Sequence, residues 1–178
     1  MAKDKFNFKT DLHLIASNDD LRPAMSLIYF KNDYCYATDA HVLIKQHISH
    51  HGIINPEHLN GKALHMRVFQ LIKQKFNYAV ATEEGIECKD EFHNKVLFNY
   101  AEMDQPEFVD RMEDVIPKGE AVEVGEIGIN LSMLNRLRKA MIINNTGCKF
   151  KFHGINKCIV VSANGEDKQL GILMPVML

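Results

Sequence analysis

Short strand-length runs recur along the whole chain, and they limit the fold more than any other feature of the sequence. Residues 149–153 alternate strictly between charged or polar and aromatic side chains, and residues 27–30 and 34–37 flank a turn-like Lys-Asn-Asp. Such runs are typical of β-strands and hairpins. Two longer stretches, 66–76 and 131–141, repeat their apolar residues with the period of a helix. The sequence therefore predicts an α+β protein.

The order of these elements repeats along the chain. Three segments of roughly sixty residues each read as strand, helix and further strands, which is the signature of a modular fold. In the first segment only residues 11–17 are available for a helix, so that helix has two turns at most. The three segments are not similar residue by residue, so the repetition lies in the pattern alone.

Composition excludes several classes of protein. Of the 178 residues 25% are charged and the net charge is −2, which excludes a generally basic nucleic-acid binder but leaves a local basic face open. No run is long enough for a membrane span, and the start lacks an apolar signal core. We therefore expect a cytoplasmic protein with no membrane partner. The four cysteines show no CxxC spacing, which favours reduced structural thiols over a redox or metal site.

An enzymatic reading has weak support. Asp39 and His41 could form a catalytic pair, but no nucleophile elbow, phosphate loop or zinc motif accompanies them. Four histidines at positions 47, 50, 51 and 58 match no standard metal spacing. We expect a solvated histidine-rich loop, no enzyme activity, no metal and no cofactor. Asp39 fits better as a corner residue that bonds the nearby backbone.

Four motifs, in the same order, resemble motifs of the bacterial sliding clamp, the beta subunit of DNA polymerase III. Residues 37–43 (Ala-Thr-Asp-Ala-His-Val-Leu) resemble its Ala-Thr-Asp-Gly-His-Arg-Leu. Residues 106–108 with 115–117 resemble its Pro-Asp-Tyr-Arg-Arg-Val-Leu-Pro, and residues 126–130 its Glu-Ile-Gly-Phe-Asn. Residues 172–178 (Ile-Leu-Met-Pro-Val-Met-Leu) resemble its terminal Val-Val-Met-Pro-Met-Arg-Leu.

The resemblance implies a DNA-clamp-like fold of repeated strand-helix-strands half-units, with helices on one face of antiparallel sheets. Residues 1–117 would form a clamp-like domain of two half-units that corresponds to the middle clamp domain. Residues 118–178 would form a third half-unit that corresponds to the second half of the last domain. The parts of the clamp that help to close its ring have no counterpart in this chain.

The chain also departs from the motifs at single positions. Ala40 replaces a glycine, and Val42 and Met177 replace arginines. Four extra residues lie between Phe108 and Val115, inside an acidic loop that we expect over residues 104–117.

In sliding clamps, partner proteins insert short hydrophobic peptides into a pocket built from these motifs. Flexible methionines suit such a pocket, because they repack around varied apolar ligands. The alternative is that the apolar members are simply core. Carried over residue by residue, the pocket would use Thr38, His41, Leu43, Pro106, Val115, Asn130, Met133, Met174, Pro175 and Met177.

The helices offer a second candidate site, for duplex DNA. Cations gather on the two helical stretches while acids gather in the loops, which suits contact with a phosphate backbone; the alternative is an ordinary solvated face. The residues concerned are Arg67, Lys73, Lys75, Arg136, Arg138 and Lys139. Two functions follow: a replication or repair accessory that binds clamp-binding peptides of polymerases or repair factors and touches DNA, or an interaction or decoy module that does not encircle DNA. A ring would require several copies to associate as a homo-oligomer.

Overall fold

Ten strands and three α-helices make up the described part of the chain, which in this computed structural model comprises residues 5–142, 147–163, 165 and 167–176. The strands are β1 (Leu27–Lys31), β2 (Tyr34–Thr38), β3 (Val42–His47), β4 (Lys62–His65), β5 (Tyr78–Ala81), β6 (Gly85–Lys89), β7 (Lys95–Asn99), β8 (Cys148–Lys151), β9 (Ile159–Ala163) and β10 (Gln169–Leu173). The α-helices are α1 (Met66–Lys75), α2 (Phe108–Asp114) and α3 (Leu131–Ala140), and the short 3-10 turns are η1 (Leu12–Leu14), η2 (Pro23–Ser26), η3 (Ile48–His50) and η4 (Pro56–Leu59).

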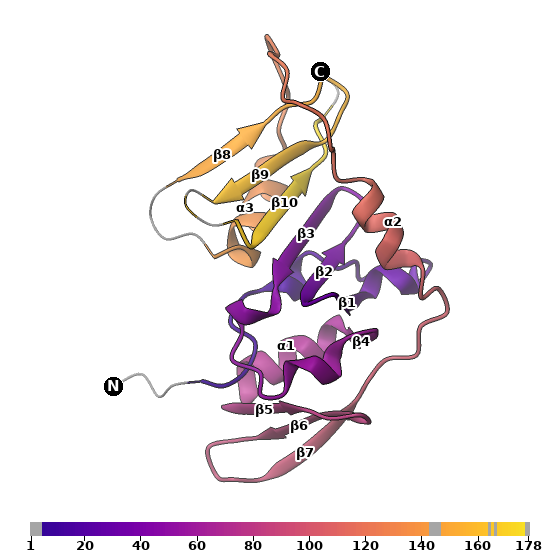
Figure 1. Cartoon of the computed structure of the whole chain (residues 1–178), viewed down its shortest axis with the longest axis vertical. Helices are drawn as coiled ribbons and strands as arrows, with labels where there is room; N and C mark the ends of the chain where they lie inside the picture. The colour runs from indigo at the N-terminus through magenta and orange to yellow at the C-terminus, as the bar shows by residue number, and fades with distance from the viewer. Residues whose placement is uncertain (1–4, 143–146, 164, 166, 177–178) are drawn as a thin grey trace.

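The strands form two antiparallel sheets. The larger has seven strands in the order β4-β1-β2-β3-β10-β9-β8, and the smaller has three in the order β5-β6-β7. In the larger sheet β3 pairs with β10, so that Leu43 faces Ile172 across the ladder. The molecule is elongated, with β8 near one end and β7 near the other (Figure 1). The strands of residues 148–173 are therefore joined to those of residues 27–47 in one continuous sheet.

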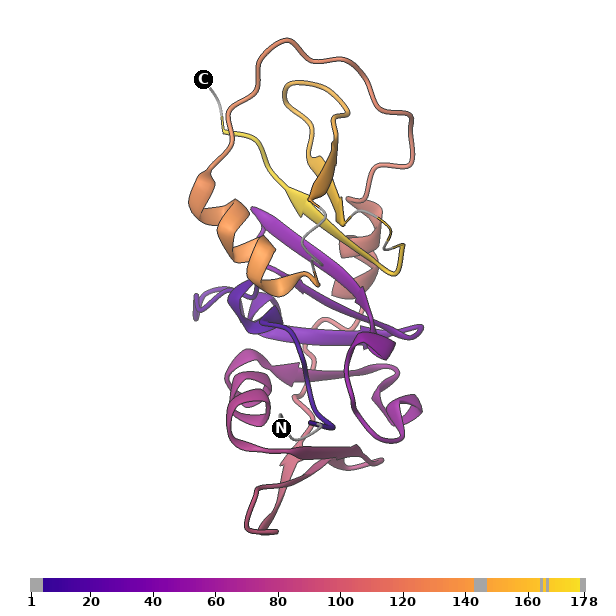
Figure 2. The same cartoon turned by 90° about the vertical axis from the view of Figure 1, so that its left-hand side faces the viewer.

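Two of the α-helices lie on one side of the larger sheet, and the third lies on the other. Figure 2 shows α3 and α1 on the left of the sheets and α2 on the right. The turn η1 contacts both α1 and α3, so the three helical segments form one row. This arrangement agrees with the predicted clamp-like fold, except that α2 was not expected.

The central strands bury side chains on both faces. Along β3, Val42 and Ile44 belong to the core beneath α1 and α3, whereas Leu43 belongs to a second core beneath α2. On β2, Cys35 and Ala37 face the first core and Tyr36 the second. A strand alternates its side chains between faces, so each of these strands holds both layers of helix against the sheet.

A buried chain of amides fixes the junction between β3 and β10. The Gln46 amide donates to Gln169 Oε1 at 2.8 Å, and Gln46 Oε1 accepts from the Thr10 hydroxyl at 2.8 Å. The Gln169 amide donates in turn to the Ile142 carbonyl. Buried polar groups lose free energy unless they are paired. The network therefore favours a single register between these two strands.

The helices at 66–76 and 131–141 are confirmed to within one residue at each end. The acidic loop over 104–117 was wrong in part, because residues 108–114 form α2. In the alternating run 149–153, the Phe150 side chain is 36% exposed. The domain boundary at residue 117 remains a prediction, and the larger sheet runs across it. No helix among the described residues is both long and apolar enough to cross a membrane.

Candidate functional site

The turn between β2 and β3 is held by the side chains of Asp39 and Thr38. Asp39 Oδ1 accepts the backbone N–H groups of His41 and Val42, both at 2.9 Å. The Thr38 hydroxyl donates to the Val42 carbonyl at 2.8 Å. Asp39 is thus confirmed as the corner residue that the sequence predicted, and its carboxylate bonds the backbone of His41.

Ala40 occupies a backbone conformation that suits glycine. Its φ is 76°, in the left-handed region where a Cβ crowds the following carbonyl at a cost of roughly 1–2 kcal/mol. The Ala40 N–H donates to Thr38 Oγ1 at 3.1 Å, which helps to hold the turn. The resembling clamp motif has glycine at this position, so the corner keeps the glycine conformation without the glycine.

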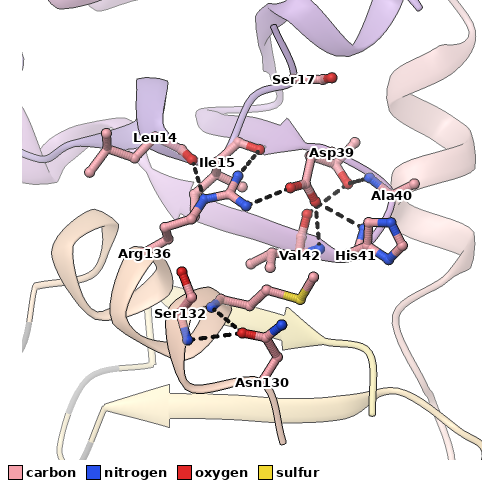
Figure 3. A network of polar contacts seen from close by, with 12 residues as sticks. Leu14, Ile15, Ser17, Asp39, Ala40, His41, Val42, Asn130, Ser132 and Arg136 are labelled. Atoms are coloured by element: carbon pink, nitrogen blue, oxygen red, sulfur yellow. Dashed lines mark hydrogen bonds and ion pairs between the residues drawn. The ribbon is translucent and has the colours of Figure 1, made fainter. Parts of the chain in front are cut away.

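Arg136 on α3 ties this corner to η1. Its Nη1 lies 2.7 Å from Asp39 Oδ2, and its Nε donates to the Leu14 carbonyl at 2.8 Å. Figure 3 shows the guanidinium enclosed by these groups and by the Ile15 carbonyl. Arg136 was predicted to contact DNA, but its guanidinium donates its hydrogen bonds to groups inside the fold.

Asn130 starts α3. Its side-chain oxygen accepts the backbone N–H groups of Ser132 at 2.9 Å and Met133 at 3.2 Å (Figure 3), which is an N-cap. The Met133 side chain packs against the core beneath α3. Asn130 and Met133 therefore have structural roles, as the N-cap of α3 and as part of the core packing. Neither residue lines the groove described next.

An open apolar groove of about 410 Å³ lies beside the corner, between α2, the start of β3 and the end of β10. Its apolar surface comes chiefly from methionines and aliphatic residues on four separate parts of the chain. The residues that line it are Met25, Thr38, Ala40, His41, Val42, Leu43, Phe108, Arg111, Met112, Val115, Asn156, Lys157, Cys158, Ile172 and Met174. Its size and composition suit a short apolar ligand.

Charge pairs hold α2 over the sheet as one wall of the groove. Asp110 pairs with Lys31 on β1 at 2.5 Å, and Glu113 pairs with Lys45 on β3 at 2.6 Å. The Tyr36 hydroxyl also donates to Glu113. Burial would raise the pKa of Glu113, but the hydrogen bonds from Lys45 and Tyr36 outweigh burial and lower it. The carboxylate therefore stays charged and keeps the helix attached.

Burial raises the pKa of the Cys158 thiol, which lines the groove and donates to the Val115 carbonyl at 3.5 Å. A thiol with a raised pKa is a poor nucleophile at neutral pH. All four cysteines are free, and Cys35 and Cys88 are buried. Cys158 thus acts as a small apolar part of the groove wall.

The structure brings five of the ten predicted pocket residues together. Thr38, His41, Leu43, Val115 and Met174 all line the groove. Pro106 lies apart, in a separate hollow beside Tyr29 and Val109. Pro175 directly follows Met174 but does not line the groove. Met177 lies outside the described residues.

Two walls of the groove were missed. Phe108, Arg111 and Met112 come from α2. Their spacing in the sequence is that of a helix, but the segment was predicted to be a loop. Asn156 and Lys157 come from the turn between β8 and β9, which carries no recognisable motif.

The predicted DNA-facing cations differ in their surroundings. Lys73 pairs with Asp11 at 2.8 Å, and Arg67 donates to the Asn18 side chain at 3.0 Å. Lys75 on α1 and Arg138 and Lys139 on α3 are exposed. The row of helices thus presents fewer uncommitted cations than the sequence indicated.

The histidine group of residues 47–58 is dispersed. His47 contacts Ser49, His51 is buried, and His58 lies 3.0 Å from Glu83. Within the described parts of the chain, no three His, Cys, Asp or Glu side chains come together so as to hold a metal ion.

No protein-family model and no curated protein matches this sequence. Solved structures do match, at 12–14% identity. They include the DNA polymerase sliding clamp of Pseudomonas aeruginosa with a ligand (13% identity, TM-score 0.61, 95% of this chain and 64% of that one). They also include DNA polymerase III subunit beta of Borrelia burgdorferi with a natural product (12%, 0.67, 94% and 60%) and the Bartonella birtlesii sliding clamp bound to griselimycin (14%, 0.62, 94% and 63%).

The chain thus has the fold of part of a sliding clamp, as the sequence motifs predicted. It spans 60–64% of the length of the three clamps named above. Identities this low establish the fold, and function has to be argued from the groove and the helices.

Proposed function

We propose that the chain is a clamp-fold accessory protein of DNA replication or repair that binds apolar peptide segments of partner proteins in the groove beside the β2–β3 corner. The observation that carries the proposal is the groove itself. Residues from three of the clamp-like motifs meet there around about 410 Å³, among them Thr38 and His41, Phe108 and Val115, and Ile172 and Met174. Several solved clamps of this fold carry ligands, including a natural product and griselimycin.

The action we propose is binding without catalysis. The Asp39 carboxylate accepts from two backbone N–H groups and from Arg136, so most of its acceptor capacity is used inside the fold. The groove surface is mainly apolar, with methionines that repack around different ligands. Partners would be polymerases or repair factors that carry clamp-binding peptides, in the cytoplasm of a bacterial cell.

Replacing Met174 with alanine is expected to lower the affinity for a fluorescein-labelled clamp-binding peptide at least about 30-fold. The reason is that loss of an apolar anchor costs ~2 kcal/mol or more of binding free energy. Met174 is 38% exposed in the groove, so the fold should tolerate its truncation. Fluorescence anisotropy measures the affinity. The matched control is Leu71→Ala, an apolar side chain 41% exposed on α1, which should leave the affinity unchanged. Absence of binding to the unaltered protein, or equal affinity for both variants, would contradict the proposal.

We propose, as a second property, weak contact between duplex DNA and the row formed by α1, η1 and α3. It is supported by the exposed Lys75, Arg138 and Lys139 on this side of the sheet. Arg136 and Lys73 have partners within the fold. Few free cations imply weak, salt-sensitive binding.

Retention on DNA separates the accessory function from that of an interaction or decoy module. If copies of the chain associate into a ring, retention on nicked circular DNA should exceed retention on linear DNA of the same length, and Arg138→Gln with Lys139→Gln should lower both. A pull-down on immobilised DNA at two salt concentrations measures this. Equal, weak retention on both forms of DNA would contradict encirclement of DNA and would favour the alternative function, an interaction or decoy module.

A further inference from the structure

The rim of the groove carries charge of one sign. Arg111 on α2 and Lys157 in the β8–β9 turn both line it, and both are exposed. Of the described residues that line the groove, none is Asp or Glu. This contrasts with the chain as a whole, whose net charge is −2.

Two acidic side chains of α2 pair with the sheet, whereas its arginine lines the groove. Asp110 and Glu113 pair with lysines of the sheet at 2.5 and 2.6 Å, so two of the helix's acidic groups are neutralised by the protein itself. Arg111, the cation of the same helix, lines the groove. An otherwise acidic helix therefore contributes a positive group at this edge.

The internal partner of Arg111 is weak. Its Nη2 lies 3.2 Å from Glu107 Oε1, one turn earlier, and both side chains are more than half exposed. Exposed pairs of this kind contribute little and exchange readily. A carboxylate of a bound segment, held in place by neighbouring apolar contacts, can replace Glu107.

We propose that Arg111 and Lys157 select partner segments that carry acidic side chains beside their apolar anchors. The inference rests on the proposed peptide-binding function and names the chemistry of its partners. The apolar groove would hold the anchors, while the two cations contact the adjacent carboxylates. Charge complementarity at an interface rim steers encounter and discriminates among partners, and it weakens as salt rises.

The test uses three forms of one labelled, C-terminally amidated clamp-binding peptide, with the two residues before its apolar anchors changed to Glu-Glu, Ser-Ser or Lys-Lys. At low salt the Glu form should bind about tenfold more tightly than the Ser form, and the Lys form more weakly still. In the double variant Arg111→Gln and Lys157→Gln, affinities for the Glu and Ser forms should become equal.

The matched control is Lys139→Gln, an exposed cation on α3 that does not line the groove, which should keep the tenfold preference. Binding of the Ser form without any preference for Glu would overturn this inference and leave the proposed function standing. A preference that survives the double variant would also overturn it. If none of the three peptides binds the unaltered protein, the proposed function and this inference fail together.

Discussion

Replacing Arg136 with methionine is expected to lower the free energy of unfolding by about 3 kcal/mol. The Asp39 side chain is 14% exposed and would lose its charged partner, and the carbonyls of Leu14 and Ile15 would lose their donors. Methionine keeps the length of the aliphatic stem but donates no hydrogen bond. Urea denaturation followed by circular dichroism measures the change.

The matched control is Arg138→Met, two residues along the same helix and exposed. It should alter the unfolding free energy by no more than ~0.5 kcal/mol. Asp39→Asn, combined with Arg136→Met in a double-mutant cycle, should give a coupling energy between the two sites. Equal stability of the two arginine variants would return Arg136 to the set of residues available to DNA.

Lowering the pH from about 6.5 towards 3 is expected to destabilise the protein through His51. This side chain is buried, its Nδ1 accepts the Lys9 backbone N–H at 3.0 Å, and its ring packs against Phe8 and Phe69. Burial lowers the pKa of His51 from 6.5 to about 3, assisted by His50 and Lys9. Between pH 6.5 and about 3 the His51 imidazole is therefore protonated in the unfolded chain but not in the folded one, and the free energy of unfolding falls as the pH drops.

One such proton costs about 1.4 kcal/mol per pH unit. Urea denaturation at a series of pH values should show a shallower pH dependence for His51→Gln than for the unaltered protein. His58→Gln is the control, because His58 is partly exposed beside Glu83. Burial also lowers the pKa of His13 and His65, so part of the pH dependence should remain in His51→Gln. Identical slopes for His51→Gln and the unaltered protein would contradict the assignment.

Periodicity along the sequence predicted most of the fold. The two long helices and the hairpins are local features whose side-chain pattern repeats within ten or so residues, and local patterns are visible in a single sequence. The helix α2 was missed because its residues were interpreted as an acidic insertion. Its spacing of Phe108, Val109 and Met112 is helical, and Val109 and Met112 are buried against the sheet.

The site was predictable only where residues act through neighbours in the sequence. Asp39 bonds the backbone two and three positions ahead, and its corner role was predicted. Arg136 bonds Asp39 across 97 positions, and no local signal distinguishes such an arginine from a cation that faces solvent. The same reason explains why Lys157 was missed, since only the pairing of distant strands brings it to the groove.

The junction of β3 with β10 has a consequence for how the molecule folds. Gln46 and Gln169, which meet there, are 123 positions apart. Closing so long a loop before its contacts form is slow, so refolding should take roughly milliseconds to seconds. Until β10 docks, β3 is an open strand edge, which invites aggregation. The same docking step brings Ile172 and Met174 to the groove. Binding competence and the last sheet contacts should therefore appear together during refolding.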